Sequence, residues 1–247
     1  MVVVFNRKFH IVVLAAGVGR RLRPLTIYNP KPMVLVQGRP IIERLLTSIP
    51  ARQVKTLTIV VGYHGEVIKE YVDKLKLPYK VSYVISLNYN STHCSSSLIK
   101  VKRLINKGVL VFNSDVLYSK NSINCFFNIT HTDSFVVCKR LSNSPSDLQK
   151  VFIRNDFIEQ WSLTMKDFHG EVIGPVYISP EQGDKMQKII NSNKEKIEKM
   201  PCFTFFSTCM ISEGLKAVMI GESDAYEIDT VSDVRQFNKH KNFYKLT

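Results

Sequence analysis

Short apolar runs alternate with amphipathic segments through the first half of the chain. The apolar runs are bounded by turn residues and predict strands that are buried on both faces of a sheet. The amphipathic segments have apolar residues at helical spacing and predict helices that cover the sheet. The expected strands are 11–14, 56–62, 81–85 and 109–112, and the expected helices are 40–46, 66–72 and 97–105. This succession predicts an α/β fold with a mainly parallel central sheet and helices on both faces.

The pattern changes after Ser134. Short strand candidates follow one another with little helix between them, which predicts a small mixed-strand extension on one side of the first half. These strands are expected at 135–138, 151–153, 157–158 and 172–173, and helices return at 180–199, 202–212 and 232–242.

Size and composition are those of an ordinary globular domain. The chain has 247 residues, of which 45% are hydrophobic and 22% are charged. An apolar run of about 18 residues, as a membrane span needs, is missing from the sequence. The five cysteines form neither a C-x-x-C pair nor a zinc-binding spacing. We therefore expect free thiols and a cytoplasmic location.

Net charge is the one unusual bulk property, with 34 Lys and Arg against 21 Asp and Glu. Such a surface can attract nucleic acid or small phosphorylated ligands. The basic residues are dispersed, and their densest segment, 185–199, also contains Glu195 and Glu198. This pattern is typical of a solvated helix, so we expect no nucleic-acid partner.

The most informative segment follows the first expected strand. Leu14-Ala-Ala-Gly-Val-Gly-Arg-Arg21 leads from that strand into glycines and basic residues, and Lys31 follows. Glycines let backbone N–H groups approach phosphate oxygens, and the basic side chains supply charge. The segment fits neither G-x-x-x-x-G-K-[ST] nor G-x-G-x-x-G. It therefore predicts a bound nucleoside triphosphate, held by a different kind of loop.

Two aspartates are placed to hold a metal ion at the same edge of the sheet. Asp115 follows the strand at 109–112, where ligands of open α/β sheets bind. Asp229 precedes the final expected helix. Carboxylates of this kind hold Mg²⁺ beside a triphosphate. Asp233 is interpreted as a first-turn helix acid, and Glu227 as either a neighbour of the ligands or an exposed residue.

The run from Leu14 to Met33 resembles the opening of the nucleotidyltransferases that make activated sugars and activated alcohols, L-A-A-G-x-G-[TS]-R-L-x-P-L-T followed by P-K-P. One departure is Arg20, where that family has Thr or Ser. The resemblance implies a Rossmann-like fold and Mg²⁺ bound by Asp115 and Asp229. It also implies phosphate binding by Arg21, Lys31 and Lys150, and an acceptor lying against Gly174. The nucleotide would lie along Leu14, Ala15, Ala16, Gly17, Gly19 and Arg20.

Within that family the chain is most similar to the phosphocholine cytidylyltransferase branch. There a segment resembling T-N-N-I-x-S-L helps to read cytosine, and this chain has Thr92-His93-Cys94-Ser-Ser-Ser97-Leu98. Thr92, His93 and Ser97 are therefore nucleotide-binding candidates, but replacement of both asparagines leaves the base preference open. A quaternary ammonium acceptor would need an aromatic cage. The candidates are Trp161, Tyr177, Phe203, Phe205 and Phe206.

These observations predict a single nucleotidyltransferase domain over residues 1–247. Residues 9–133 would form the nucleotide-binding half, 134–225 the acceptor-binding part, and 226–247 the metal segment with a closing helix. The expected enzyme joins the NMP part of an NTP, foremost CTP, to a small phosphorylated acceptor such as phosphocholine and releases pyrophosphate. The alternatives are a sugar-1-phosphate nucleotidyltransferase and a non-catalytic nucleotide-sensing subunit. The acceptor, the oligomeric state and the pathway are not predicted.

Overall fold

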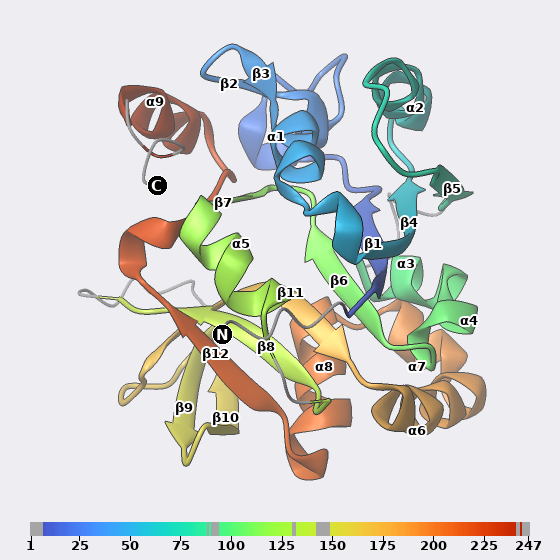
Figure 1. The fold of residues 1–247 in the computed structure, drawn as a ribbon, viewed down its shortest axis with the longest axis vertical. Coiled ribbons are helices and arrows are strands. Elements are labelled where there is room, and N and C mark those ends of the chain that lie inside the picture. The colour runs from blue at the N-terminus through green and yellow to red at the C-terminus, as the bar shows by residue number, and fades with distance from the viewer. Residues whose placement is uncertain are drawn as a thin grey trace.

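The first half of the chain forms the parallel sheet that the sequence predicts (Figure 1). The computed structural model describes residues 7–87, 89, 94–129, 132–141, 149–240 and 243. Its first strands in sheet order are β5, β4, β1 and β6, and every neighbouring pair is parallel. Their bounds are Val81–Ile85 for β5, Val54–Val61 for β4, Phe9–Ala15 for β1 and Val109–Asn113 for β6.

Strand β1 lies between β4 and β6 in the sheet, and all seven of its residues are therefore buried. Its side chains alternate between the two faces of the sheet, as the pleat of a strand requires. Phe9, Ile11 and Val13 enter one hydrophobic core, and Val12 and Leu14 enter the other. A strand that contributes to two cores has apolar residues at nearly every position, and this continuous apolar run is what predicts the strand from the sequence.

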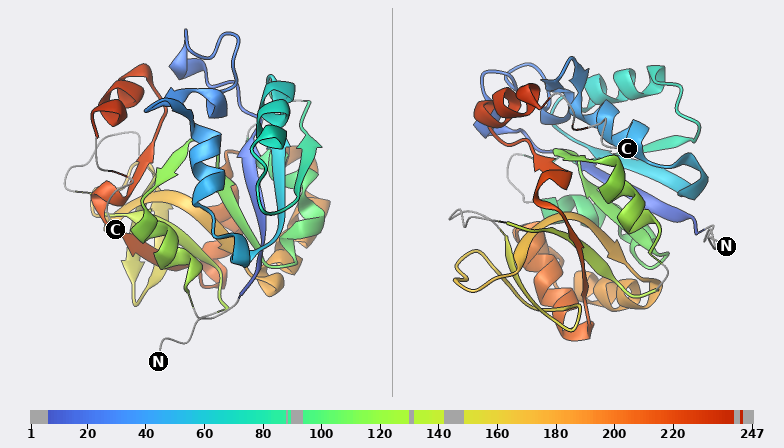
Figure 2. Two further views of the ribbon diagram at one scale, coloured as in Figure 1. Left: turned by 45° about the horizontal axis from the view of Figure 1, so that its top comes forward. Right: turned by 60° about the vertical axis from the view of Figure 1, so that its left-hand side comes forward.

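Helices cover both faces of the sheet (Figure 2). On one face lie α1 (Ile41–Ser48), α2 (Gly65–Lys74) and α5 (Lys120–Phe127). The other face is covered by α3 (Cys94–Lys100), α4 (Lys102–Ile105), α6 (Pro180–Ser192), α7 (Lys194–Glu198) and α8 (Cys202–Met210). Two helices predicted as continuous are each divided in two, at Val101 and at Asn193.

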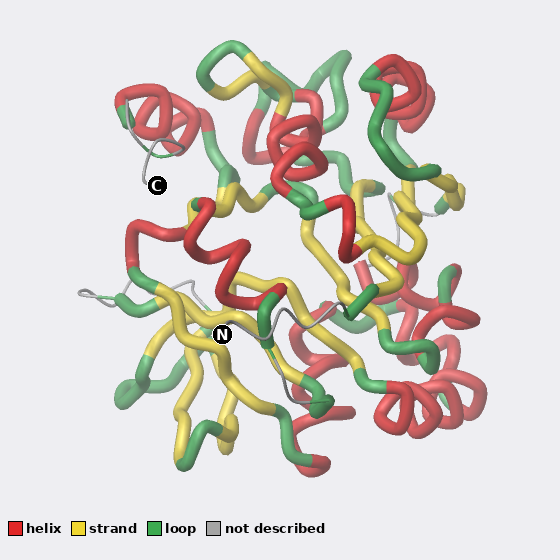
Figure 3. Tube along the Cα trace, viewed as in Figure 1, coloured by secondary structure: helices red, strands yellow, loops and turns green. Residues whose placement is uncertain are grey.

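The second half continues the same sheet instead of forming a separate layer (Figure 3). The strand β11 (Gly170–Ile178) pairs antiparallel with β6, and the order runs on as β11-β8-β12-β10-β9. The remaining bounds are Phe135–Lys139 for β8, Lys150–Arg154 for β9, Phe157–Ser162 for β10 and Lys216–Ile220 for β12. The strand β12 and the helix α5 are not among the elements predicted from the sequence.

A short antiparallel ribbon returns the end of the chain to the first half. Strand β13 (Ala225–Glu227) pairs with β7 (Val116–Tyr118), which follows β6 directly. Helix α9 (Val231–Lys239) then packs with the hairpin of β2 (Leu35–Val36) and β3 (Arg39–Pro40) around a third small core. The ribbon brings two segments that are far apart in the sequence to one edge of the sheet.

The expectation of free thiols is wrong for two of the five cysteines. Cys94 and Cys202 form a disulfide, with their Cα atoms 5.5 Å apart, and Cys125, Cys138 and Cys209 are free. The two paired residues are separated by 108 positions. They meet because α3 and α8 pack on the same face of the sheet, a proximity that spacing in the sequence does not reveal. Among the described helices, we find none with the length and apolar character needed to span a membrane.

Candidate active site

A pocket of about 250 Å³ lies at the carboxyl ends of β1 and β6. Its lining includes four of the nine residues predicted to bind the nucleotide, Leu14, Ala16, Gly17 and Ser97, together with Lys31 and Asp115. Backbone groups join the two strands here, since Ser114 N donates to Leu14 O at 3.3 Å. Ligands of open α/β sheets bind at this edge. We call this the nucleotide pocket.

Other predicted nucleotide-binding residues lie away from that lining. Ala15 is buried in the core on the face of the sheet covered by α1. Gly19 and Arg20 belong to the loop beyond β1, where Arg20–Leu22 forms a 3-10 turn. Thr92 and His93 lie outside the described residues. The nucleotide-binding roles of these residues stay predictions.

Gly19 has a specific structural role in this loop. Its φ is +66°, and a Cβ atom built there would lie 2.8 Å from Cβ of Lys31. Thr26 is fully buried, and its hydroxyl donates to Gly19 O at 2.8 Å. The glycine therefore lets Lys31 pack directly against the loop, and Thr26 fixes the backbone that makes this possible.

Gly19→Ala is expected to destabilise the protein by about 1–2 kcal/mol, because an L-residue is strained at this φ and its Cβ would displace Lys31. Thermal denaturation with pyrophosphate-release kinetics measures both effects. Gly17→Ala is the matched control, since a Cβ at Gly17 meets no atom within 4 Å. Equal stability of the two variants would contradict this role of Gly19.

The two predicted metal ligands converge although 114 positions separate them in the sequence. Asp115 follows β6, and Asp229 follows β13, whose pairing with β7 aligns the two segments. Ile228 N also donates to Asp115 O at 2.9 Å. Lys31 Nζ donates to Asp115 Oδ2 at 2.6 Å and also to Asp229 Oδ1, so its ammonium bridges both carboxylates.

Asp233 fixes the backbone that carries Asp229. Its Oδ2 accepts hydrogen bonds from Asp229 N at 2.9 Å and Thr230 N at 2.7 Å, while Thr230 Oγ1 accepts from Asp233 N. This reciprocal arrangement is a capping box at the start of α9. The interpretation of Asp233 as a first-turn helix acid is therefore confirmed, and its capping of the backbone is an additional role.

Glu227 is a third carboxylate at the site, and the sequence reading left its role open. One oxygen from each of Asp115, Glu227 and Asp229 lies within 4.8 Å of the others. The Glu227 residue is exposed. Desolvation and the charges of the two aspartates raise the pKa of its carboxyl group above the usual value. The cluster is therefore short of positive charge despite Lys31.

The donor set fits a divalent cation. Asp115 Oδ1 is buried, and it has no hydrogen-bond partner among the described residues. Such an oxygen is costly to leave unsatisfied and is a good ligand for Mg²⁺. Asp115 and Asp229, with Glu227 beside them, are the residues that would hold the ion.

Two basic residues contact this cluster. Burial alone would lower the pKa of Lys31, but its ion pairs with Asp115 and Asp229 outweigh that effect and raise the pKa. Arg21 Nη2 donates to Asp229 Oδ2 at 2.6 Å from a largely exposed side chain. Both side chains thus lie where phosphate groups could replace the carboxylates as partners.

A second pocket of about 230 Å³ adjoins the first, and Asn113 lines both. Its lining combines aromatic and acidic side chains, and it includes Arg21 and Asp229. We call this the acceptor pocket. Three of the predicted cage residues line it: Trp161, Phe203 and Phe206. The other two candidates, Tyr177 and Phe205, are not in the cage, because both are 1% exposed in the hydrophobic cores.

Gly174 lies on the wall of the acceptor pocket, as predicted for a residue against which the acceptor packs. Its φ is +72°, and it precedes a cis peptide bond to Pro175. The sequence reading missed Glu171, a buried carboxylate that lines the same pocket and pairs with Lys139 at 2.7 Å. A pairing between neighbouring strands has no local signature in the sequence.

Lys150 lies on β9 at the edge of this region. Lys150 is 6% exposed, and its Nζ lies 5.2 Å from the centre of the Phe168 ring. Gln149, its neighbour, lines the acceptor pocket and accepts a hydrogen bond from Trp161 Nε1 at 3.2 Å. The phosphate-binding role of Lys150 stays a prediction.

Comparison with known proteins agrees with this geometry. The family model described as nucleotidyl transferase matches residues 10–143. The choline-phosphate cytidylyltransferase of Streptococcus pneumoniae is 25% identical over 245 residues, which cover 92% of this chain and 96% of that protein. The bifunctional protein GlmU of Methanococcus maripaludis is 33% identical over 117 residues, which cover 47% of this chain and 27% of that protein. The match thus spans about a quarter of that longer relative.

The fold is likewise shared with solved structures. That of the CTP:phosphocholine cytidylyltransferase from Streptococcus pneumoniae superposes with a TM-score of 0.75 at 22% identity, covering 94% of this chain and 98% of that one. The matched family segment, residues 10–143, carries residues 16–21, which we call the glycine loop, together with Lys31 and Asp115. This chain belongs to the nucleotidyl transferase family.

Proposed function

We propose that the protein is a Mg²⁺-dependent cytidylyltransferase that transfers the CMP part of CTP to a small phosphorylated acceptor, phosphocholine foremost, and releases pyrophosphate. The observation that carries this proposal is the position of Asp115 and Asp229, which lie where the nucleotide pocket and the acceptor pocket adjoin. An ion held there would stand between the two substrates. We also propose that the protein works in the cytoplasm, where CTP is available.

The residues of the chain divide the work of alignment and charge neutralisation. The backbone at Leu14, Ala16 and Gly17 would hold the triphosphate through its N–H groups. Lys31 and Arg21 would bind its phosphates and offset charge on the pyrophosphate as it leaves. Mg²⁺ bound at Asp115 and Asp229 would supply further neutralisation of the phosphate charge. The acceptor phosphate is already a nucleophile, so alignment is the main requirement.

The lining of the acceptor pocket supports a cationic headgroup. Trp161, Phe203 and Phe206 offer aromatic faces, and Glu171 and Glu227 offer negative charge. Aromatic faces attract quaternary ammonium groups. The choline-phosphate cytidylyltransferase of Streptococcus pneumoniae matches over nearly its whole length, so its activity supports the same acceptor for this chain. GlmU, in contrast, matches over less than half of this chain.

Pyrophosphate release tests the proposal. The purified protein is incubated with Mg²⁺ and each of the four NTPs, against phosphocholine, phosphoethanolamine, aminoethylphosphonate and sugar 1-phosphates. We expect release with CTP and phosphocholine. Release with a sugar phosphate alone would replace the proposed acceptor with the alternative class. NTP binding without any release would favour a nucleotide-sensing subunit.

A further inference from the structure

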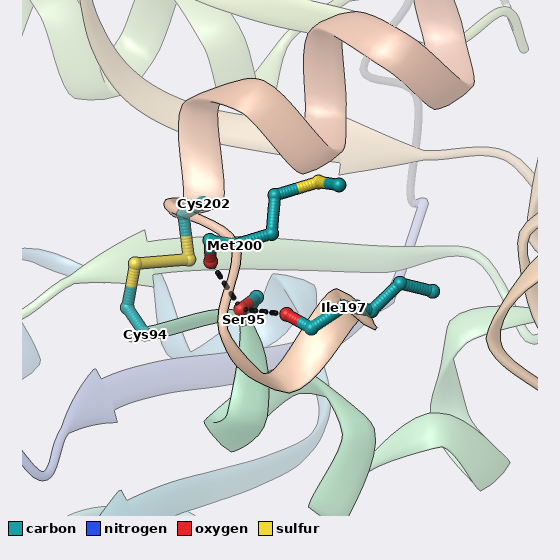
Figure 4. The surroundings of a disulfide bond; sticks show 5 residues. All are labelled: Cys94, Ser95, Ile197, Met200 and Cys202. Carbon is teal, nitrogen blue, oxygen red and sulfur yellow. Dashed lines mark hydrogen bonds between the residues drawn. A yellow bond between two sulfur atoms is a disulfide. The ribbon is translucent and has the colours of Figure 1, made fainter. Parts of the chain in front are cut away.

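The Cys94–Cys202 disulfide joins the first residue of α3 to the first residue of α8 (Figure 4). Cys94 lines the nucleotide pocket, whereas Cys202 lines the acceptor pocket. The disulfide therefore joins the nucleotide side of the site to the acceptor side.

The start of α8 depends on this bond more than the rest of the helix does. Its N-cap is Pro201, and no side chain caps it. Farther along, Phe205 and Cys209 are buried, and Gln182 Nε2 donates to Cys209 O at 2.6 Å. Cys202 and Phe203 are only partly buried against the same core, so the disulfide is the strongest restraint on the first turn, while the remainder of α8 is buried.

The preceding turn is held independently. Ser95 Oγ points at the carbonyl oxygens of Ile197 and Met200, and it lies 2.6 Å from Ile197 O (Figure 4). These contacts tie α3 to the end of α7 whether or not the disulfide is present. Loss of the disulfide would therefore leave Cys202 and Phe203 with only their partial packing against the core, while α7 stays in place.

We propose that the Cys94–Cys202 bond is a redox-sensitive tether that orders the Phe203 side of the acceptor pocket and thereby sets acceptor affinity. This inference rests on the proposed function for the identity of the acceptor. Cys94 is exposed, so a reductant can reach it. In a reducing compartment, disulfides commonly serve redox sensing.

The chemistry of the switch is thiol–disulfide exchange with a dithiol reductant. A thiolate of the reductant attacks one cysteine sulfur, forms a mixed disulfide and releases the other cysteine as a thiolate, which takes up a proton. The second thiol of the reductant then closes its own disulfide and releases the first cysteine. Two electrons and two protons pass from the dithiol to Cys94 and Cys202.

Thiol counting and tryptophan fluorescence test the tether without requiring turnover. Purified without added thiol or disulfide, the denatured full chain should titrate three thiols, those of Cys125, Cys138 and Cys209, and all five after dithiothreitol. Trp161 is the only tryptophan and lines the acceptor pocket. Its quenching by acrylamide should increase on reduction. Five thiols before reduction, or unchanged quenching, would overturn the proposal.

Ligand affinities separate a positioning role from general loosening. Calorimetry with phosphocholine should show that reduction weakens binding by about three- to tenfold, the value of ordering one large side chain. CTP affinity should change by less than about twofold, because the Ser95 contact and the buried residues of α3 keep the Cys94 side of the nucleotide pocket in place. Equal losses for both probes would contradict the tether.

Variants complete the comparison. Cys202→Ser should behave like the reduced protein under all conditions, and Cys125→Ser, at an exposed free cysteine, should behave like the parent chain. If Cys202→Ser fails to fold, the reduced parent chain supplies the same comparison. If phosphocholine binds to neither form, the proposed acceptor is wrong, and the quenching measurement still decides whether the tether exists.

Discussion

Asp115→Asn and Asp229→Asn are each expected to abolish measurable turnover, a loss on the order of 10³-fold, while the protein stays folded. Each substitution removes one of the charges that would hold Mg²⁺, and the amide that replaces it is a weaker ligand. Pyrophosphate release measures the loss, and circular dichroism with thermal denaturation verifies the fold.

The matched control is Asp167→Asn, an exposed aspartate that lines neither pocket of the site. It should retain the activity of the parent chain. Near-normal turnover in either Asp115→Asn or Asp229→Asn would refute the assignment of that aspartate as a required metal ligand.

Lys31→Met is expected to affect both catalysis and stability. Turnover should fall by about 10²-fold or more, because the variant lacks a cation that would bind the triphosphate. Without metal, the variant should also lose about 2–3 kcal/mol of unfolding free energy, since Asp115 and Asp229 lose the ammonium that bridges them. For a chain of this size the loss lowers Tm by roughly 4–12 °C.

Mg²⁺ distinguishes this effect from simple loss of packing. The ion can replace the missing ammonium charge, so Mg²⁺ should raise the Tm of Lys31→Met more than that of the parent chain. Lys74→Met, at an exposed position near the end of α2, serves as the control and should show neither change. A Tm of Lys31→Met that does not respond to Mg²⁺ would mean that the carboxylates are not a cation site.

The parts of the structure that the sequence predicted have strong local signals. The strand β1 is a continuous apolar run, and the loop after it carries a long, specific motif. The nucleotide pocket follows from these two features. Asp115 and Asp229 were identified because each stands next to a recognisable strand or helix, and the structure brings them together.

The parts that the sequence did not predict depend on contacts between distant segments. The disulfide, the Lys139–Glu171 pair and the bridging position of Lys31 join residues that share no local pattern. The helix α5 is different, because it does have a local signal. Ser119 caps it, and Ile123, Phe126 and Phe127 follow at helical spacing. That spacing, together with the serine cap, predicts a helix at these residues.

Because β13 pairs with β7, the active site is completed only late in the synthesis of the chain. The loop after β1, Lys31 and Asp115 emerge from the ribosome first, whereas Asp229 emerges more than a hundred residues later. Leu22 and Val34, on either side of Lys31, also pack with Ile228 and Phe237 in the third core. A prematurely terminated chain would therefore lack both the second metal ligand and part of the core that supports the loop.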